Sequence, residues 1–241
     1  MLLDLIFGGF QKEDIIVLLM WIPIVMLSLS LHETAHAYIA YKLGDPTARN
    51  LGRCTMNPIK HIDPMGFLAM LVVGFGWANP VPINSRNFEN PKKGMAISSL
   101  AGPVSNLLLA TLMALLFAIF EGLYMFSPFF AKNETTMIAL YYVALFFYYG
   151  VWLNVSLAIF NFIPVPPLDG SRILGLILPT KYYFKFMEYE RYIGIGFAIV
   201  VIALSYMGIS IISWIVEPVA SGIMWLFETP IIALLEKIWL S

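Results

Sequence analysis

The stretch S-L-S-L-H-E-T-A-H-A-Y, Ser28–Tyr38, places two histidines and a glutamate inside a long apolar run, Ile15–Tyr41. About 20 apolar residues suffice for a helix that crosses a bilayer. Ionisable side chains are costly in hydrocarbon, and those found there usually serve a function. His32, Glu33 and His36 therefore predict a functional site within the membrane, with satisfied polar residues or a chance match as the alternative.

The composition assigns the whole chain to the membrane class. Of its 241 residues, 60% are hydrophobic and 12% are charged, and the mean hydropathy is +0.81, outside the range of soluble globular domains. The net charge of −1 and the lack of any Lys/Arg-rich run indicate no nucleic-acid partner. The single cysteine, Cys54, excludes disulfides within the chain and argues against a cysteine-based metal site. The expected environment is the lipid bilayer.

The apolar runs predict an all-α polytopic membrane protein with about five to six transmembrane helices. A shorter run, Met65–Trp77, cannot span, so we expect a re-entrant or short β element between the first two long spans. No repeat or polar linker divides the chain, which predicts a single domain over residues 1–241, with a core at 15–178 and a C-terminal helical pair at 192–238. The five long runs are Ile15–Tyr41, Met95–Gly122, Met137–Phe162, Tyr192–Val216 and Val219–Ile238.

The distribution of basic residues predicts the orientation, because Lys and Arg concentrate in cytoplasmic loops. If the segment after the first span is cytoplasmic, 12 of the 14 basic residues lie inside and only Lys12 and Lys132 lie outside. This predicts a multi-pass protein of the cell membrane with its N-terminus outside and its C-terminus in the cytoplasm. His36 and His32 then lie roughly 9 and 15 Å before Lys42, below the cytoplasmic surface.

The spacing His-Glu-x-x-His places two imidazoles one helical turn apart on one face, where they can bind one zinc ion. Glu33 is rotated by about 100° from His32, so its carboxylate can reach a zinc-bound water without being a ligand. Steps of four residues along this face read Ser28, His32, His36, Ala40 and Gly44. Apart from the histidines the face is small, so that another helix can come close and complete the site.

A catalytic zinc needs a third protein ligand, and Asp169 is the best acidic residue that the sequence offers. It lies in F-N-F-I-P-V-P-P-L-D-G, where the third long span reaches the cytoplasmic side. The three prolines prevent a helix from continuing, and non-helical backbone at membrane depth occurs where it is buried in protein or lines a wet cavity. The alternative is that Asp169 only caps a helix at Gly170–Leu178.

With these motifs the chain resembles the site-2 protease family of intramembrane zinc metalloproteases, in its small branch without PDZ or CBS domains. The first family pattern is met by H-E-T-A-H, and the second, Asn-x-x-Pro-x-Pro-x-x-Asp-Gly, by residues 161–170. The third, Gly-Pro-x-x-x-Asn or a close variant, appears as G-P-V-S-N at residues 102–106, with two residues instead of three before the asparagine. Ser171 stands where many members carry a second glycine. The resemblance implies one Zn²⁺ held by His32, His36 and Asp169, with Glu33 as general base.

The expected reaction is hydrolysis of peptide bonds in or near transmembrane segments of membrane protein substrates, at a site that opens to the cytoplasmic side. Asn161 is the candidate donor to the oxyanion, with capping of the broken helix as its alternative role. Asn106 is a candidate for substrate contact or for hydrogen bonding between spans. A regulatory partner is possible in place of the missing domains. Two rival functions stay open: an ion or proton transporter, and a non-catalytic relative that binds transmembrane segments.

Three further features have weaker interpretations. His61, in N-P-I-K-H-I-D-P, is expected to be structural rather than a ligand. Leu51–Asn57 alternates apolar and polar residues imperfectly, and predicts either a short edge strand that could pair with an unwound substrate or an ordinary interfacial loop. The glycines Gly74 and Gly76 suggest a flexible element beside the entry path.

Overall fold

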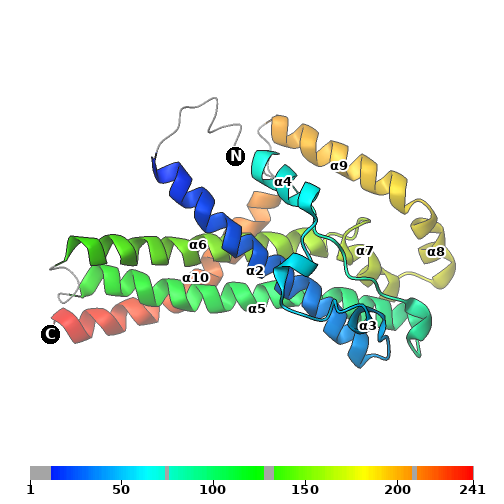
Figure 1. Ribbon diagram of the computed structural model, residues 1–241, viewed down its shortest axis with the longest axis horizontal. Helices are drawn as coiled ribbons and strands as arrows, with labels where there is room; N and C mark the ends of the chain where they lie inside the picture. The colour runs from blue at the N-terminus through cyan, green and yellow to red at the C-terminus, as the bar shows by residue number, and fades with distance from the viewer. Residues whose placement is uncertain (1–11, 74–75, 128–132, 208–210, 241) are drawn as a thin grey trace. The chain divides into compact units, whose positions relative to one another are not determined.

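The computed structural model describes residues 12–73, 76–127, 133–207 and 211–240, which form two compact units (Figure 1). Unit 1 holds the described residues of 1–105 and 160–209, and unit 2 holds those of 106–159 and 210–241. Helices α5 and α6 each continue from one unit into the other. The single domain over residues 1–241 that is expected from the sequence stays a prediction.

The predicted all-helical membrane class is confirmed, since the described residues contain four helices long and apolar enough to cross a membrane. Their bounds agree closely with the first three predicted spans. The predicted total of five to six is not confirmed. The four helices are α2 (Lys12–Lys42), α5 (Pro91–Phe126), α6 (Glu134–Phe162) and α10 (Ile211–Leu240).

The C-terminal helices differ from their predicted bounds. Helix α9 (Glu190–Tyr206) has 17 residues, and α10 passes through Glu217, where the sequence suggested a break before Val219. Pro218 and Pro230 both lie inside α10, which is possible because proline is tolerated in membrane helices. A helix of 17 residues is about 26 Å long, close to the hydrocarbon thickness, and the expected cytoplasmic C-terminus requires α9 to cross.

The elements of unit 1 other than the long helices are short. Between α2 and α5 lie α3 (Thr47–Asn50), the 3-10 turn η1 (Pro58–Lys60), α4 (Pro64–Val73) and the 3-10 turn η2 (Ser85–Asn87). After α6 come α7 (Asp169–Ile173), the 3-10 turn η3 (Leu174–Leu176), α8 (Thr180–Glu188) and α9. With ten residues α4 is too short to span, as the sequence predicts, and the expected helix at 170–178 is shorter and partly 3-10.

Of the two alternatives for Leu51–Asn57, the short edge strand is wrong and the loop is what forms, because this segment consists of turns and bends. The amides of Gly52 and Arg53 donate back to the carbonyls of Arg49 and Ala48 in α3, at 3.0 and 2.8 Å. Gly52 has a φ of +65°, which reverses the chain there. The one β feature among the described residues between α2 and α5 is an isolated antiparallel bridge, Ile62–Ala78. Gly74 lies outside the described residues.

A buried carboxylate fixes the chain where it leaves α2. Asp45 accepts hydrogen bonds from the backbone of Thr47 and Asn84 and from the side chain of Asn87, the last two at 2.7 Å. Burial raises the pKa of Asp45, but these hydrogen bonds outweigh it and hold the pKa below its usual value. Asp45 thereby ties the end of α2 to the segment that leads into α5.

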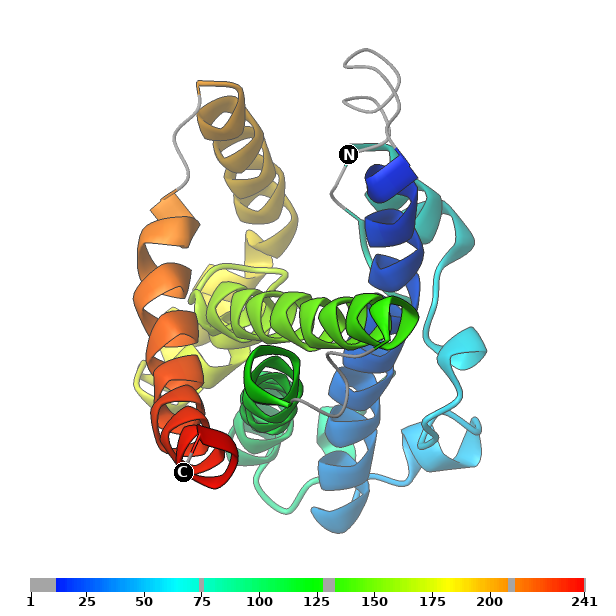
Figure 2. The same ribbon diagram turned by 90° about the vertical axis from the view of Figure 1, so that its left-hand side faces the viewer.

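In unit 2, α5 and α6 run antiparallel and side by side (Figures 1 and 2). Aromatic rings pair along them, Phe117 with Tyr148 at 5.6 Å between centroids and Tyr124 with Tyr141 at 6.0 Å. Deeper between the helices, the Asn106 amide donates to Asn154 Oδ1 at 2.8 Å, and both side chains are fully buried. Amides inside hydrocarbon require such partners.

Candidate metal centre

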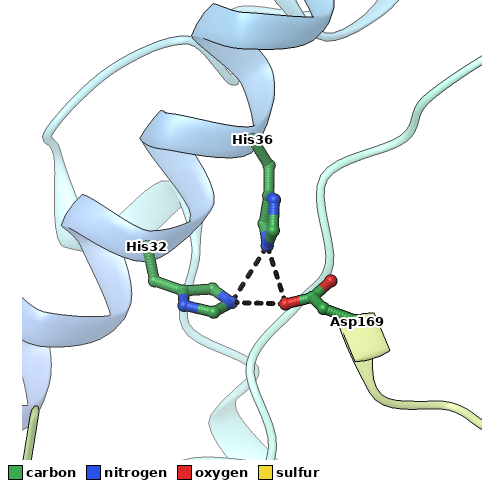
Figure 3. Close-up of side chains that lie close together, drawn as sticks. All are labelled: His32, His36 and Asp169. Atoms are coloured by element: carbon green, nitrogen blue, oxygen red, sulfur yellow. Dashed lines mark hydrogen bonds and ion pairs between the residues drawn. The ribbon is translucent and has the colours of Figure 1, made fainter. Parts of the chain in front are cut away.

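The structure brings His32, His36 and Asp169 together in unit 1 (Figure 3). His32 Nε2 lies 3.0 Å from His36 Nε2, and Asp169 Oδ2 lies 3.2 and 3.1 Å from these two nitrogens. The histidines are 6% exposed, and the Asp169 side chain is 19% exposed. These three residues are the ligand set that the sequence predicts.

Helix α2 presents both imidazoles from one face because the residues are four apart. The rest of that face is small and fully buried at Ser28 and Ala40, as the sequence suggests. The hydroxyl of Ser28 donates to the carbonyl of Ile24 at 2.7 Å, so no polar atom of this serine is left facing the apolar surroundings without a partner. The face therefore offers the two ring nitrogens as its candidate ligands.

Asp169 is delivered by the non-helical segment that follows α6. The chain leaves α6 at Phe162, turns through its prolines and begins α7 at Asp169, with Leu168 in the cap position. Asp169 is therefore the first residue of the helix and not its cap, which removes the alternative reading of this carboxylate. A Cβ on Gly170 would lie 2.3 Å from the carbonyl oxygen of Ile163, so only glycine fits this turn.

Helix α5 completes the surroundings of the two imidazoles with backbone atoms. His36 Nδ1 lies 2.7 Å from the carbonyl oxygen of Ser98, which only accepts, so Nδ1 carries the hydrogen and Nε2 presents a lone pair in the neutral ring. A Cβ on Gly102 would lie 2.4 Å from His36 Nε2 and 2.6 Å from His32 Cε1. Gly102 lets α5 approach both rings, which gives the third family motif a physical role.

The chemistry of the donor set fits a metal ion. The lone pair of His36 Nε2 and the carboxylate oxygen of Asp169 are both electron-rich, and at 3.1 Å they repel each other unless a proton or cation lies between them. Ligands at about 2.1 Å from a tetrahedral zinc are separated by about 3.4 Å. The three observed separations, 3.0 to 3.2 Å, are close to this value.

Glu33, the predicted base, lies beside this group and is 8% exposed. Its Oε2 accepts a hydrogen bond from the backbone N–H of Val81 at 2.8 Å. Val81 belongs to the A-N-P-V-P-I segment, Ala78–Ile83, and sequence reasoning gave it no role. A backbone amide leaves no signature in the residue type, so pattern alone could not have found it.

The remaining predicted residues lie as follows. Asn161 is half-buried in the last turn of α6, and its role as an oxyanion donor stays a prediction. Asn106 forms the amide pair with Asn154 in unit 2, and substrate contact by it stays a prediction. His61 is fully buried with Nε2 at 2.7 Å from the carbonyl oxygen of Thr55, outside the His–Asp group.

An apolar helix with a His-Glu-x-x-His motif, and a carboxylate beside its two histidines, is typical of a membrane-bound metallopeptidase. The model of Peptidase family M50 matches residues 20–203. The chain is 38% identical over 203 residues, 83% of its length and 82% of the relative's, to "Putative zinc metalloprotease YwhC" of Bacillus subtilis. The chain therefore belongs to Peptidase family M50, the site-2 proteases, and the resemblance seen in the sequence is confirmed.

Two more distant relatives carry similar names. "Putative zinc metalloprotease Rip2" of Mycolicibacterium smegmatis is 29% identical over 188 residues, 74% of this chain and 64% of the relative. "Zinc metalloprotease MJ0392" of Methanocaldococcus jannaschii is 27% identical over 190 residues, 78% of this chain and 43% of the relative. No solved structure gives a significant match. Family and composition together define a zinc metalloprotease of membranes.

Proposed function

We propose that this chain hydrolyses peptide bonds in or near transmembrane segments of membrane protein substrates, at a zinc site that opens to the cytoplasm. The observation that carries the proposal is the convergence of His32, His36 and Asp169 to within 3.2 Å. The two histidines lie on α2, a helix apolar enough to cross the bilayer. Three ligands leave a tetrahedral ion one open position for water or substrate, which is typical of catalytic rather than structural zinc.

The two histidines and the aspartate would hold the ion, each through one atom. When bound there, zinc supplies Lewis-acid chemistry: it polarises a carbonyl oxygen and makes water more acidic. The chain's own residues do the rest. The Glu33 carboxylate takes a proton from the attacking water and returns one to the leaving amine.

Asn161 is proposed to donate from its side-chain amide to the carbonyl oxygen as negative charge develops on it. Its place at the end of α6, eight residues before Asp169, keeps it in the segment that delivers the third ligand. Asn106 is proposed only as a secondary contact to the substrate, since its side-chain amide already donates a hydrogen bond to Asn154. The Glu33 carboxylate and the two imidazoles are buried. Water is therefore proposed to reach them through a path from the cytoplasmic side, where the basic loops are expected to lie.

The substrates proposed are membrane proteins whose transmembrane segment unwinds locally, because a helical amide is shielded by its own hydrogen bonds. The protein is proposed to lie in the cell membrane with its N-terminus outside and its C-terminus in the cytoplasm. The split of basic residues, 12 inside against 2 outside, supports this orientation. A separate regulatory protein is proposed as a further partner.

The test compares wild type with Glu33→Gln on a panel of single-span membrane proteins, with zinc content measured in parallel. We expect equal zinc in both and a loss of cleavage of about a hundredfold to ten-thousandfold in Glu33→Gln, the usual contribution of general acid–base catalysis. Glu217→Gln makes the same chemical change at an exposed site of α10 and is expected to cleave normally.

Cleavage that survives Glu33→Gln would contradict the assigned mechanism. Zinc bound by a wild type that cuts no substrate would favour the non-catalytic relative. Ion flux into proteoliposomes that is abolished by Glu33→Gln would favour transport instead.

A further inference from the structure

The general base is held by an extended segment that contains few hydrogen-bond donors. Between Asn79 and Ile83 the chain reads N-P-V-P-I, and the two prolines have no N–H. Of the remaining amides, that of Val81 donates to Glu33 Oε2 at 2.8 Å. Glu33 therefore has one carboxylate oxygen fixed by the backbone of another element, while its second oxygen is left for proton transfer.

This segment is itself held in place by hydrogen bonds to both the N–H and the carbonyl oxygen of Asn79. The Asn79 amide donates to the carbonyl oxygen of His61 at 2.7 Å, next to the isolated bridge between Ile62 and Ala78. The guanidinium of Arg53 donates to the Asn79 carbonyl oxygen at 2.6 Å. The backbone two residues before Val81 is thus fixed by atoms of the loop that follows α2.

The imidazole of His61 connects this loop back to α2. Its Nε2 lies 2.7 Å from the Thr55 carbonyl oxygen, which also accepts from the Thr34 hydroxyl at 2.6 Å. A carbonyl oxygen only accepts, so His61 Nε2 carries the hydrogen. Thr34 is the residue after Glu33. These hydrogen bonds, together with the backbone of residues 79–81, therefore form a closed circuit, a continuous path of contacts from Thr34 in α2 through Thr55, His61 and Asn79 back to Glu33.

We propose that the Val81 amide and His61 are positioning residues for Glu33: the amide orients the carboxylate, and His61 holds in place the segment that carries the amide. This inference rests on the proposed function, in which Glu33 is the base. It assigns a task to the buried His61, which the metal centre does not use. A misplacement of about 1 Å at a reacting group can cost a hundredfold in rate, so such a circuit has a measurable effect.

Val81→Pro removes the one hydrogen that carries the contact. We expect kcat on a substrate cleaved by the wild type to fall about tenfold to a hundredfold, with KM within about twofold and zinc content unchanged. Val81→Ala keeps the N–H and should restore most of the rate. Ile83→Pro introduces the same ring two residues further on, at an amide outside the circuit, and serves as the matched control. A kcat of Val81→Pro equal to that of Ile83→Pro would overturn the proposal.

His61 is tested by replacements that keep or remove its donor. A glutamine amide can occupy the position of Nε2–H, whereas leucine cannot donate. We expect His61→Leu to lower kcat about tenfold at unchanged zinc content, and His61→Gln to recover most of it. Equal rates for the two variants, or a loss of zinc in His61→Leu, would contradict a positioning role for this histidine.

Hydrogen exchange tests the contact without any turnover. In purified zinc-loaded protein, a peptide covering residues 77–85 reports the few amides of this segment. We expect Glu33→Ala to speed exchange at the Val81 amide, and Glu33→Gln, which keeps an acceptor, to leave it protected. Unchanged exchange in Glu33→Ala would overturn the contact.

The two proposals fail in different ways. A wild type that cuts nothing, with exchange behaving as expected, overturns the proposed function and leaves only the contact. Normal cleavage by the wild type, with no loss of kcat in Val81→Pro, overturns the positioning role alone.

Discussion

Two groups of polar side chains involve the apolar helices of this protein, and they differ in the partners that they need. In unit 2, Asn106 Nδ2 donates to Asn154 Oδ1, and Asn154 Nδ2 donates to the Gly150 carbonyl, each at 2.8 Å. In unit 1, two imidazole nitrogens and a carboxylate oxygen converge to within 3.2 Å. The first group consists of donors matched to acceptors, whereas the second consists mainly of electron-rich atoms.

The difference separates a structural polar pair from a functional site. An amide carries both donors and acceptors, so the asparagine pair is satisfied by the protein alone. In the His–Asp group, His36 Nδ1–H donates to the Ser98 carbonyl oxygen, which leaves His36 Nε2 to face the Asp169 carboxylate. Burying such atoms is costly unless a cation joins them. Burial alone therefore does not identify a site, but the balance of donors and acceptors does.

The largest expected effect is that of Asp169→Ala. Removal of the oxygen ligand leaves two imidazoles, and we expect zinc affinity to fall by about a hundredfold or more, since even residues around a ligand contribute tenfold to a hundredfold. Zinc content after dialysis against a chelator of known affinity measures this. Asn154→Leu, in the other polar group, is the control and should retain its zinc. An Asp169→Ala protein with a full complement of zinc would remove Asp169 from the ligand set.

The next effect is that of Gly102→Ala, which tests the approach of α5 to both imidazoles. The added Cβ would meet His36 Nε2 at 2.4 Å, so the rings or the helix must move. We expect zinc affinity to fall about tenfold and the protein to lose about 1–3 kcal/mol of stability, the usual cost of overpacking. Gly222→Ala in α10 meets no atom within 4 Å and is the matched control. If both alanine variants bind zinc like the wild type, the close approach has no functional role.

The smallest effect is expected from Asn106→Leu and Asn154→Leu. Each leaves a buried amide without its partner, which costs about 1–2 kcal/mol of stability, and the double variant should recover part of this loss. Denaturant titration of the detergent-solubilised protein measures the free energy of unfolding. The zinc content of these variants should not change. If Asn106→Leu alone also impairs cleavage beyond its stability loss, Asn106 contacts substrate as well. Strict additivity of the two single losses would contradict the pairing.

The sequence predicted the parts of the site that residue types carry. The four-residue spacing of His32 and His36 needs only a helix to place both rings on one face, and the prolines before Asp169 exclude a helix there, whatever the packing. The contributions of the Ser98 carbonyl and the Val81 amide could not be predicted, because backbone groups are the same in every residue. Gly102 was visible only as part of a family motif until the distance to the imidazoles gave it a reason.

The errors in the fold have physical causes too. Leu51–Asn57 alternates like a strand, but its amides bond back to α3 and Gly52 reverses the chain. The sequence predicted separate spans at Tyr192–Val216 and Val219–Ile238, whereas α10 begins at Ile211 and continues through Pro218 to Leu240. In the first place the turn that follows α3, and in the second the apolar setting of the helix, outweighed the local pattern.

The most direct test of the central claim is X-ray absorption at the zinc edge of the purified wild-type protein, together with the zinc content per chain. We predict one zinc ion per chain, coordinated by nitrogen and oxygen atoms at about 2.0–2.2 Å with the outer-shell scattering of two imidazoles. A protein that binds no zinc after purification and zinc loading, or a zinc ion whose spectrum lacks imidazole scattering, would contradict the account.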